Sequence, residues 1–393
     1  MNRRLGQRRS LKITLLTGCL ATMGCSEEGR RDLPPPEQSP VGIVQPSMGD
    51  MVLIDRQTGS TFNLRGEAIA GPLSESNFRL EQLATVNMFW FAWRSFFPEG
   101  EVWTQPGAQP ATQLPEDKTG AQGCEGGIDC APSLPHVGPP SGALAWTRAG
   151  ADDAQYLRDS DIVLGTVYDQ RPRAYPYNVL AWHEMANDRI GDLYYSVSLC
   201  PLTGSAVVWG NNEGIRSLGV SGNLLNFNLV MYDHASESLW PQLWMGAASG
   251  PNEGRWLNRL PSTETTWANW KKMYPDTLVL SDNTGFSFNY RTTPFRRFDG
   301  ERPTVGLDAP IPLGLYPSKS MVLGLIDRPA NVARGYSFID LLREGGERVA
   351  LNETFNAEPV VVVFEESSQT ALAFVAKGPS GQTLIFDVAA YTP

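Results

Sequence analysis

The chain of 393 residues contains a long internal duplication, and this feature constrains its fold more than any other. Each copy opens with a similar segment, at 51–72 and at 229–251. This segment contains an apolar run, an aspartate and a small polar turn, and it ends with a Gly-Pro pair. The matching segments are 51–72 with 229–251, 161–184 with 320–344, and 195–208 with 359–374. Five positions recur at a constant offset of 177 residues: Trp90/Trp267, Trp93/Trp270, Phe97/Tyr274, Pro98/Pro275 and Val102/Val279. Because this period is far longer than a solenoid repeat, the order A–B–A′–B′ indicates a duplicated domain.

Strands dominate the elements that the sequence predicts. Apolar runs bounded by turn residues predict strands at 51–55, 60–64, 161–168, 194–199 and 205–209. Two further runs predict a buried helix over 83–97 and a short helix from Pro176 or Tyr177 to about Met185. Strands joined by hairpins, with short helices packed on the sheets, define an α+β class of antiparallel, β-rich structure. The first repeat half is expected over 48–212, with a loop insertion at 104–160, and the second over 213–393.

The N-terminus has the pattern of a lipoprotein signal peptide over residues 1–24. A basic stretch precedes an apolar stretch that is too short for a permanent transmembrane helix. Cleavage before Cys25 would leave a lipid-bearing cysteine on a flexible tether, rich in Pro and Glu, over 25–47. Cys19 is an alternative acylation site, and a plain secretory peptide is a second alternative. We therefore expect an exported protein of the cell envelope whose only membrane contact is a lipid anchor. Ser26 favours the outer membrane, with the protein facing the periplasm or the surface.

The charge balance argues against nucleic acid as a partner. The formal net charge is −10, and it becomes −15 once the five basic residues of the signal peptide are removed. No basic run remains to neutralise a phosphate backbone. The partner is therefore expected to be a small molecule or a component of the envelope.

Three cysteines lie beyond the signal peptide and the lipid-bearing Cys25. Cys124 and Cys130 flank a glycine-rich turn, and in an oxidising compartment they are expected to form a disulfide. A metal clip is the alternative for this pair. Cys200 is left without a partner, which in an exported protein requires an explanation.

The candidate catalytic site consists of three residues with reactive side chains that occur in one copy only: His183, Glu184 and Cys200. The zinc motif HExxH is absent, because Asn187 stands where the second histidine would be. His183 is either a structural residue or a metal ligand or general base oriented by Glu184 or Asp188.

Cys200 begins the sequence Cys-Pro-Leu-Thr-Gly-Ser at the end of a predicted strand. It is either a small buried apolar residue or a nucleophile paired with His183. The same pair, with a third ligand, would form a copper or zinc site. Ser205, Ser221 and Asn226 are expected to border a ligand pocket there. Ser221 is not a hydrolase nucleophile, because Gly-Val-Ser-Gly-Asn fails the GxSxG pattern at its last position.

Three long strings resemble the bacterial family DUF3179, whose activity is not established. They are AYPYNVLAWHEMANDRIGDLYYSVSLCPLTGSAV, LGVSGNLLNFNLVMYDHASESLWPQ and LPSTETTWANWKKMYPDTLVLSDNTGFSFNY, and the resemblance covers about 150 to 380. Many relatives carry a second cysteine where this chain has Thr203, so a CxxC dithiol mechanism does not apply. The leading hypothesis is a metal- or thiolate-dependent envelope enzyme. The alternative is a non-catalytic module that binds a small polar ligand or an envelope partner.

Overall fold

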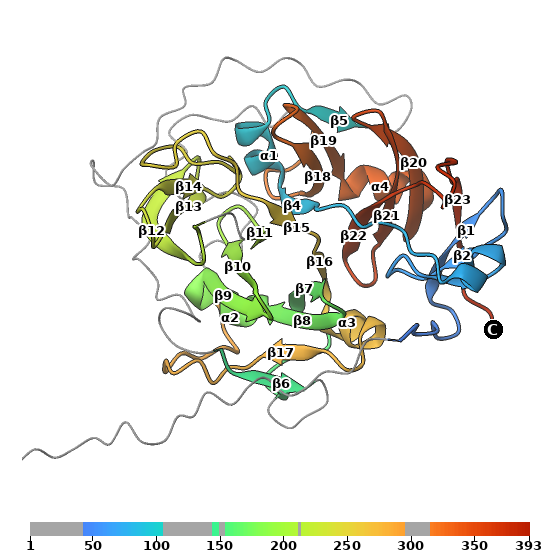
Figure 1. Ribbon diagram of the computed structural model, residues 1–393, viewed down its shortest axis with the longest axis horizontal. Helices are drawn as coiled ribbons and strands as arrows, with labels where there is room; N and C mark the ends of the chain where they lie inside the picture. The colour runs from blue at the N-terminus through green and yellow to red at the C-terminus, as the bar shows by residue number, and fades with distance from the viewer. Residues whose placement is uncertain (1–41, 105–143, 149–153, 211–213, 295–314) are drawn as a thin grey trace, which may run out of the picture. The chain divides into compact units, whose positions relative to one another are not determined.

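Figure 1 shows the computed structural model of the protein, which describes residues 42–104, 144–148, 154–210, 214–294 and 315–393. The described residues have the predicted α+β fold, with mostly antiparallel sheets and four short α-helices. In these ranges, the helices are all too short or too polar to span a bilayer. The expected signal peptide, the lipidated Cys25 and the Cys124–Cys130 disulfide lie outside the described residues.

Two of the sheets share one strand order. In each, three antiparallel strands are followed by a strand that pairs in parallel, β17 beside β8 and β5 beside β19. The first sheet consists of β16 (Thr263–Thr266), β7 (Ile162–Tyr168), β8 (Arg171–Pro176), β17 (Leu278–Leu280) and β6 (Trp146–Arg148). The second consists of β4 (Val86–Phe89), β18 (Met321–Asp327), β19 (Val332–Ser337) and β5 (Glu101–Trp103).

The pairing in these two sheets crosses the predicted boundary between the halves. β4 and β5, from the first half, pair with β18 and β19 of the second. Conversely, β16 and β17 pair with β7 and β8 of the first half. The shared strand order is what a duplication would produce, while the duplication and the boundary at residue 212 stay predictions.

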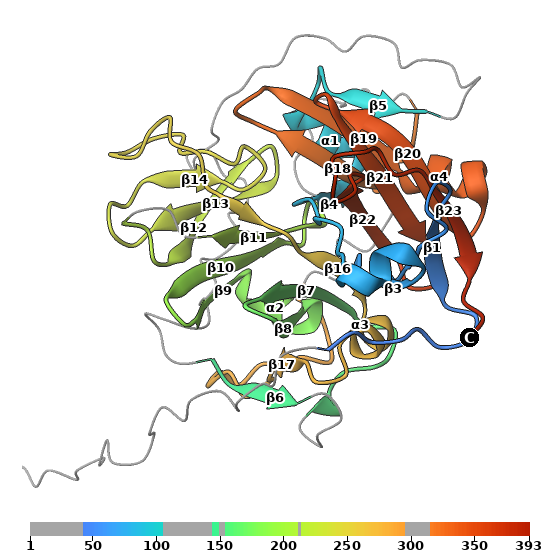
Figure 2. The same ribbon diagram turned by 45° about the vertical axis from the view of Figure 1, so that its right-hand side comes forward.

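The other four sheets have three or four strands each, and antiparallel pairing joins their neighbouring strands (Figure 2). One contains β23 (Phe386–Ala390), β1 (Met51–Asp55), β2 (Thr61–Phe62) and β3 (Ala68–Ala70). The next contains β12 (Leu218–Leu225), β13 (Asn228–Asp233) and β14 (Leu239–Pro241). The third contains β15 (Arg259–Leu260), β11 (Ser205–Gly210), β10 (Leu193–Cys200) and β9 (Met185–Ile190). The last contains β20 (Arg348–Phe355), β21 (Glu358–Glu365) and β22 (Thr370–Val375). A 3₁₀ helix, η1 (Pro72–Ser76), follows β3.

The helices are α1 (Trp90–Phe96), α2 (Tyr177–His183), α3 (Trp267–Met273) and α4 (Phe338–Gly345). The prediction of one helix over 83–97 was wrong in its first part, because Val86–Phe89 forms β4 and pairs with β18. A short apolar run does not distinguish a central strand from a buried helix, and only the distant partner strand decides between them.

Recurrence in both copies favours a folding role for the paired tryptophans, and the structure places them in the core. Trp93 and Trp270 are 0% and 1% exposed, and each packs on a strand glycine. A Cβ atom at Gly165 would lie 2.2 Å from the Trp270 ring, and one at Gly324 would lie 3.0 Å from Trp93. The indole ring of Trp270 therefore packs α3 directly on the backbone of β7, and that of Trp93 packs α1 on the backbone of β18.

Candidate functional site

Cys200 and Ser205 face each other across the hairpin that joins β10 to β11. Gly204 turns the chain between them with a φ of 61°, a conformation that glycine adopts without strain. The ring of Phe89 lies directly over Gly204, where a Cβ atom would approach it to 2.8 Å. Phe89 N also donates a hydrogen bond to Thr203 O at 2.8 Å. The hairpin is thus fixed from outside by β4.

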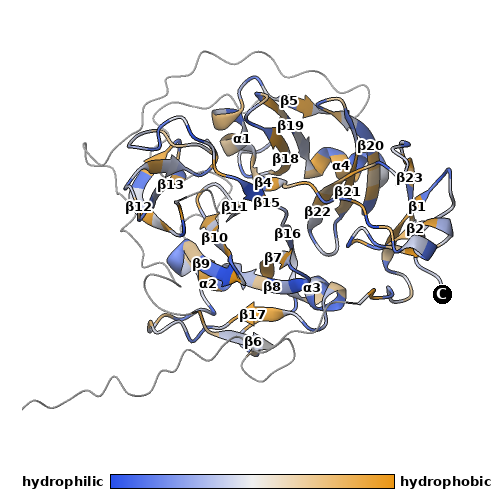
Figure 3. Cartoon of the chain, viewed as in Figure 1, coloured by the Kyte–Doolittle hydropathy of each residue, from blue (hydrophilic) through white to orange (hydrophobic). Residues whose placement is uncertain are grey.

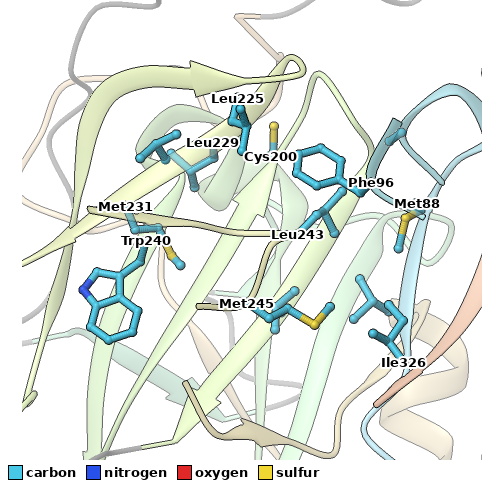
Figure 4. Close-up of a cluster of buried hydrophobic side chains, with 14 of the residues drawn as sticks. Met88, Phe96, Cys200, Leu225, Leu229, Met231, Trp240, Leu243, Met245 and Ile326 are labelled. Atoms are coloured by element: carbon cyan, nitrogen blue, oxygen red, sulfur yellow. The ribbon is translucent and has the colours of Figure 1, made fainter. Parts of the chain in front are cut away.

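Cys200 is buried in an apolar cluster. It is 1% exposed, and Figure 4 shows it near Leu225, Leu229 and Phe96. Its Sγ donates a hydrogen bond to Phe227 O at 3.6 Å. Burial raises the pKa of the thiol to about 11, and the nearby Glu184 carboxylate adds to this rise. The group is therefore a protonated thiol at neutral pH, which is a poor nucleophile and metal ligand.

Glu184 follows α2 directly and caps it in a left-handed conformation, with a φ of 53°. Its carbonyl accepts a hydrogen bond from Leu199 N at 2.9 Å, which ties the end of α2 to β10. The side chain is buried, and burial raises its pKa to about 8. Most molecules therefore carry a neutral carboxylic acid at this position at neutral pH.

His183 lies among aromatic side chains. Its Nε2 is hydrogen bonded to Tyr290 OH at 2.6 Å. The rings of Phe286 and Phe288 lie 5.3 and 5.5 Å from the imidazole, measured between centroids. These contacts join the end of α2 to the segment after β17, so they account for His183 as a structural residue.

The predicted metal site is not assembled in the described part of the chain. No three His, Cys, Asp or Glu side chains gather there in a way that would hold a metal ion. Copper or zinc at His183 and Cys200 would need both side chains within bonding distance of one ion. Their observed partners differ, Tyr290 for the first and Phe227 for the second.

Asp188, the second residue predicted to orient His183, belongs to a separate buried cluster. Its carboxylate accepts hydrogen bonds from Arg173 Nη1 at 2.5 Å, Tyr175 OH at 2.5 Å and Tyr195 OH at 2.6 Å. The guanidinium of Arg173 lies 4.7 Å from the centroid of the Trp146 ring. This hydrogen-bonded cluster joins β8 to β9 and β10, which explains Asp188 by packing.

Ser205 takes part in a buried network of neutral side chains. Its Oγ donates to Gln242 Oε1 at 2.7 Å, and Gln242 Nε2 donates to Ser198 Oγ at 2.8 Å. Asn228 Nδ2 donates to Thr203 Oγ1 at 2.9 Å. All five residues are 0% exposed, so the network joins three strands and the hairpin without facing solvent.

Ser221 and Asn226 have local folding roles. Ser221 Oγ donates to Val230 O at 2.6 Å, across the irregular pairing of β12 with β13. Asn226 and Phe227 form the turn between these strands, with φ of 49° and 65°. Two positive φ values suit the two-residue turn of a β-hairpin, and asparagine tolerates them well. Binding of a ligand by Ser205, Ser221 or Asn226 stays a prediction.

A cavity of about 540 Å³ lies elsewhere, and sequence reasoning did not identify it. It is lined by the ends of β15 and β18 and by the hairpin between β20 and β21. The residues of its wall that carry polar or aromatic groups include Trp256, Arg259, Asp327, Arg328, Phe355 and Glu358. Its volume lies within the range of small-molecule sites, which is roughly 300–1,000 Å³.

The two arginines of the cavity donate to backbone carbonyls. Arg259 Nη1 donates to Ala84 O at 2.9 Å, and its Nη2 donates to Ile326 O. Arg328 Nη2 donates to Leu243 O at 3.0 Å. Figure 3 shows β18 as mostly hydrophobic. β15 consists of the hydrophilic Arg259 and the hydrophobic Leu260.

A signal for Arg259 was present in the duplication. Arg259 stands 177 positions after Gln82, so the first copy has a neutral residue at the equivalent place. Gln82 bridges Phe374 in β22, whereas Arg259 pairs with Trp209 in β11. The comparison of copies that selected His183 and Cys200 would therefore also have selected Arg259.

These features define a β-rich α+β protein with a buried thiol and a cavity that contains two arginines. The chain belongs to the family of proteins of unknown function DUF3179, whose model matches residues 25–100 and 134–390. Comparisons with curated proteins and with solved structures returned no match.

Proposed function

We propose that this protein is an exported, lipid-anchored module of the cell envelope that binds a small molecule in the cavity beside Arg259 and Arg328. The observation that carries the proposal is the cavity itself, of about 540 Å³ and bordered by the half-exposed ring of Trp256. Large apolar cavities with a few polar groups are the usual form of a small-molecule site.

The predicted envelope enzyme has less support. Thiolate chemistry needs an ionised, reachable sulfur, whereas the Cys200 thiol is 1% exposed and has a pKa raised to about 11. The Nε2 atom of His183 is hydrogen bonded to Tyr290 OH, which engages one of the two ring nitrogens that a base for Cys200 could use. The cavity therefore favours a binding module over catalysis at these residues.

Export and the lipid anchor rest on the N-terminal sequence. The basic stretch, the apolar stretch and the Gly-Cys pair before the tether together fit a lipoprotein signal. In this proposal Cys25 carries the lipid, the domain faces the periplasm or the surface at the outer membrane, and nucleic acid is not a partner.

An uncharged fluorescent probe tests the binding function. N-phenyl-1-naphthylamine should bind the purified protein saturably, with an increase in its emission. Ala84→Phe, which adds a ring to the wall of the cavity, should weaken this binding at least about tenfold. Ala330→Phe is the matched control, because it adds the same ring to an exposed turn residue outside the cavity. Equal binding by all three proteins, each shown to be folded by its melting curve, would overturn the proposal.

A further inference from the structure

The geometry points to an organic monoanion as the ligand, with its acidic group between the guanidiniums of Arg259 and Arg328 and its apolar body against Trp256. This inference rests on the proposed binding function and names the ligand class for the same cavity. Three observations support it: the charged side chains of the cavity wall, the hydrogen-bond partners of those side chains, and the aromatic rings around them.

The two guanidiniums form no ion pair in the part of the chain that the structure describes. Thirteen ion pairs form between described residues, and neither Arg259 nor Arg328 belongs to one. Their hydrogen bonds go to backbone carbonyls, which carry only a partial charge. An arginine that is partly buried is normally matched by a carboxylate or a phosphate. Two such groups at one cavity leave a place for an external anion.

Burial and mutual repulsion make the bare site costly. Burial lowers the pKa of Arg259 to about 10, and Asp327 opposes this change in part. Burial also lowers the pKa of Arg328 to about 10, and the charge of Arg259 lowers it further. Both groups remain charged at neutral pH. An anion between them would interact favourably with both and relieve their repulsion, because Coulomb interactions are strengthened where water is excluded.

Arg328 is held in place by aromatic rings and still has an unused donor. Its guanidinium lies 4.4 Å from the centroid of the Phe97 ring and 5.3 Å from that of Trp244. Its Nε is buried and has no hydrogen-bond partner among the described residues. A buried donor without an acceptor destabilises the fold. The stacking contacts hold the guanidinium in one position, and its Nε can donate one further hydrogen bond.

The charge count of the wall selects a monoanion. Glu358 forms an ion pair with Lys377, so its charge is already balanced. Asp327 accepts hydrogen bonds from Asn356 Nδ2 at 3.0 Å and Ala330 N at 3.1 Å, but it has no ion pair among the described residues. Two arginines and one aspartate leave a net charge of +1. A single carboxylate or sulfonate matches this charge, whereas a dianion would leave an excess negative charge beside Asp327.

The rest of the wall suits an apolar or aromatic body. Trp256 is 40% exposed at the edge of the cavity, and Leu325, Phe355 and Val360 line its inside. The exposed part of the indole ring offers a flat apolar surface on which the body of a ligand could pack.

Two probes that differ only by an acidic group test the inference. 8-Anilinonaphthalene-1-sulfonate has the body of N-phenyl-1-naphthylamine and adds one sulfonate. The purified wild-type protein should bind the sulfonate probe at least about tenfold more tightly than the neutral probe. Sodium chloride should weaken the binding of the sulfonate probe and leave the neutral probe unchanged.

Charge variants locate the effect in the cavity. Arg328→Gln and Arg259→Gln should each reduce the preference for the sulfonate to about twofold or less. Arg328→Lys, which keeps the charge but loses the planar fork, should retain part of it. Arg291→Gln, at an exposed residue outside the cavity, should leave the preference intact.

The outcomes separate the inference from the proposed function. Equal binding of the two probes by the wild-type protein, still weakened by Ala84→Phe, would overturn the monoanion while the binding module stands. A preference that survives both Arg→Gln changes would also overturn the inference. If Ala84→Phe binds both probes as tightly as the wild-type protein does, the proposed function itself is overturned.

Discussion

The carboxyl group of Glu184 lies close enough to the thiol of Cys200 to raise the pKa of that thiol. Both groups are buried, and each has a pKa shifted towards its neutral form. Two of the three residues of the candidate catalytic site are therefore neutral side chains in the folded protein near neutral pH.

Cys200 should not react with a water-soluble thiol reagent in the folded protein. At pH 8 the thiol is almost fully protonated and buried, so both ionisation and access oppose the reaction. Titration with a disulfide reagent should show no difference between wild type and Cys200→Ala in buffer, and a difference of one thiol per chain in denaturant. A rapidly reacting extra thiol in the folded wild type would contradict this.

Glu184 should make folding stability fall as the pH rises. Its pKa is raised from an ordinary value of about 4.5 to about 8, so the folded state keeps a proton that the unfolded state releases between these values. Below about pH 4.5 the protonated Glu184 contributes fully to the free energy of unfolding. This contribution falls by about 1.4 kcal/mol per pH unit as the pH rises towards 8. Urea unfolding should show Glu184→Gln gaining stability relative to wild type as the pH rises from 5 to 8. If the difference in free energy of unfolding between Glu184→Gln and wild type stays constant from pH 5 to 8, burial does not raise the pKa of Glu184.

Gly204→Ala should destabilise the protein more than Gly191→Ala. Both glycines have similar positive φ, 61° and 58°, so the backbone strain is nearly the same. A Cβ atom at Gly204 meets the Phe89 ring at 2.8 Å, whereas one at Gly191 meets nothing within 4 Å. We expect an additional loss of about 1–3 kcal/mol in the free energy of unfolding for Gly204→Ala. Equal losses in chemical unfolding would show that β4 does not fix the hairpin.

Cys25→Ser should release the protein from the membrane fraction, whereas Cys19→Ser should not. Only the cysteine that follows the cleavage site carries the lipid, and the domain has no other predicted membrane contact. Incorporation of a labelled fatty acid, together with membrane fractionation, checks this. Loss of the label in Cys19→Ser but not in Cys25→Ser would assign the anchor to the other cysteine.

Much of the fold could be predicted from the sequence because local signals specify it. Hairpin turns and strand patterns give β7, β10 and β11 within a residue or two of their observed bounds. The burial of Trp93 and Trp270 followed from their recurrence. The pairing of β4 with β18 did not follow, because strands more than 200 residues apart leave no local trace of their register.

The candidate site was less predictable, because it depends on which segments meet. The sequence places His183, Glu184 and Cys200 near one another, but successive side chains at the end of α2 have different surroundings. The cavity gathers residues from six segments that are separate in the sequence, and these residues include Trp256, Arg328 and Phe355. No spacing rule connects these positions in the sequence. No sequence motif distinguishes an arginine that forms an ion pair from an arginine that does not.

The most direct test of the central claim is the ratio of two dissociation constants, measured on the purified wild-type protein. The constant for N-phenyl-1-naphthylamine divided by that for 8-anilinonaphthalene-1-sulfonate should be about ten or more, and should fall to about two or less in Arg328→Gln. A ratio near one in the wild type, or an unchanged ratio in the variant, would contradict a cavity built to hold an organic anion between Arg259 and Arg328.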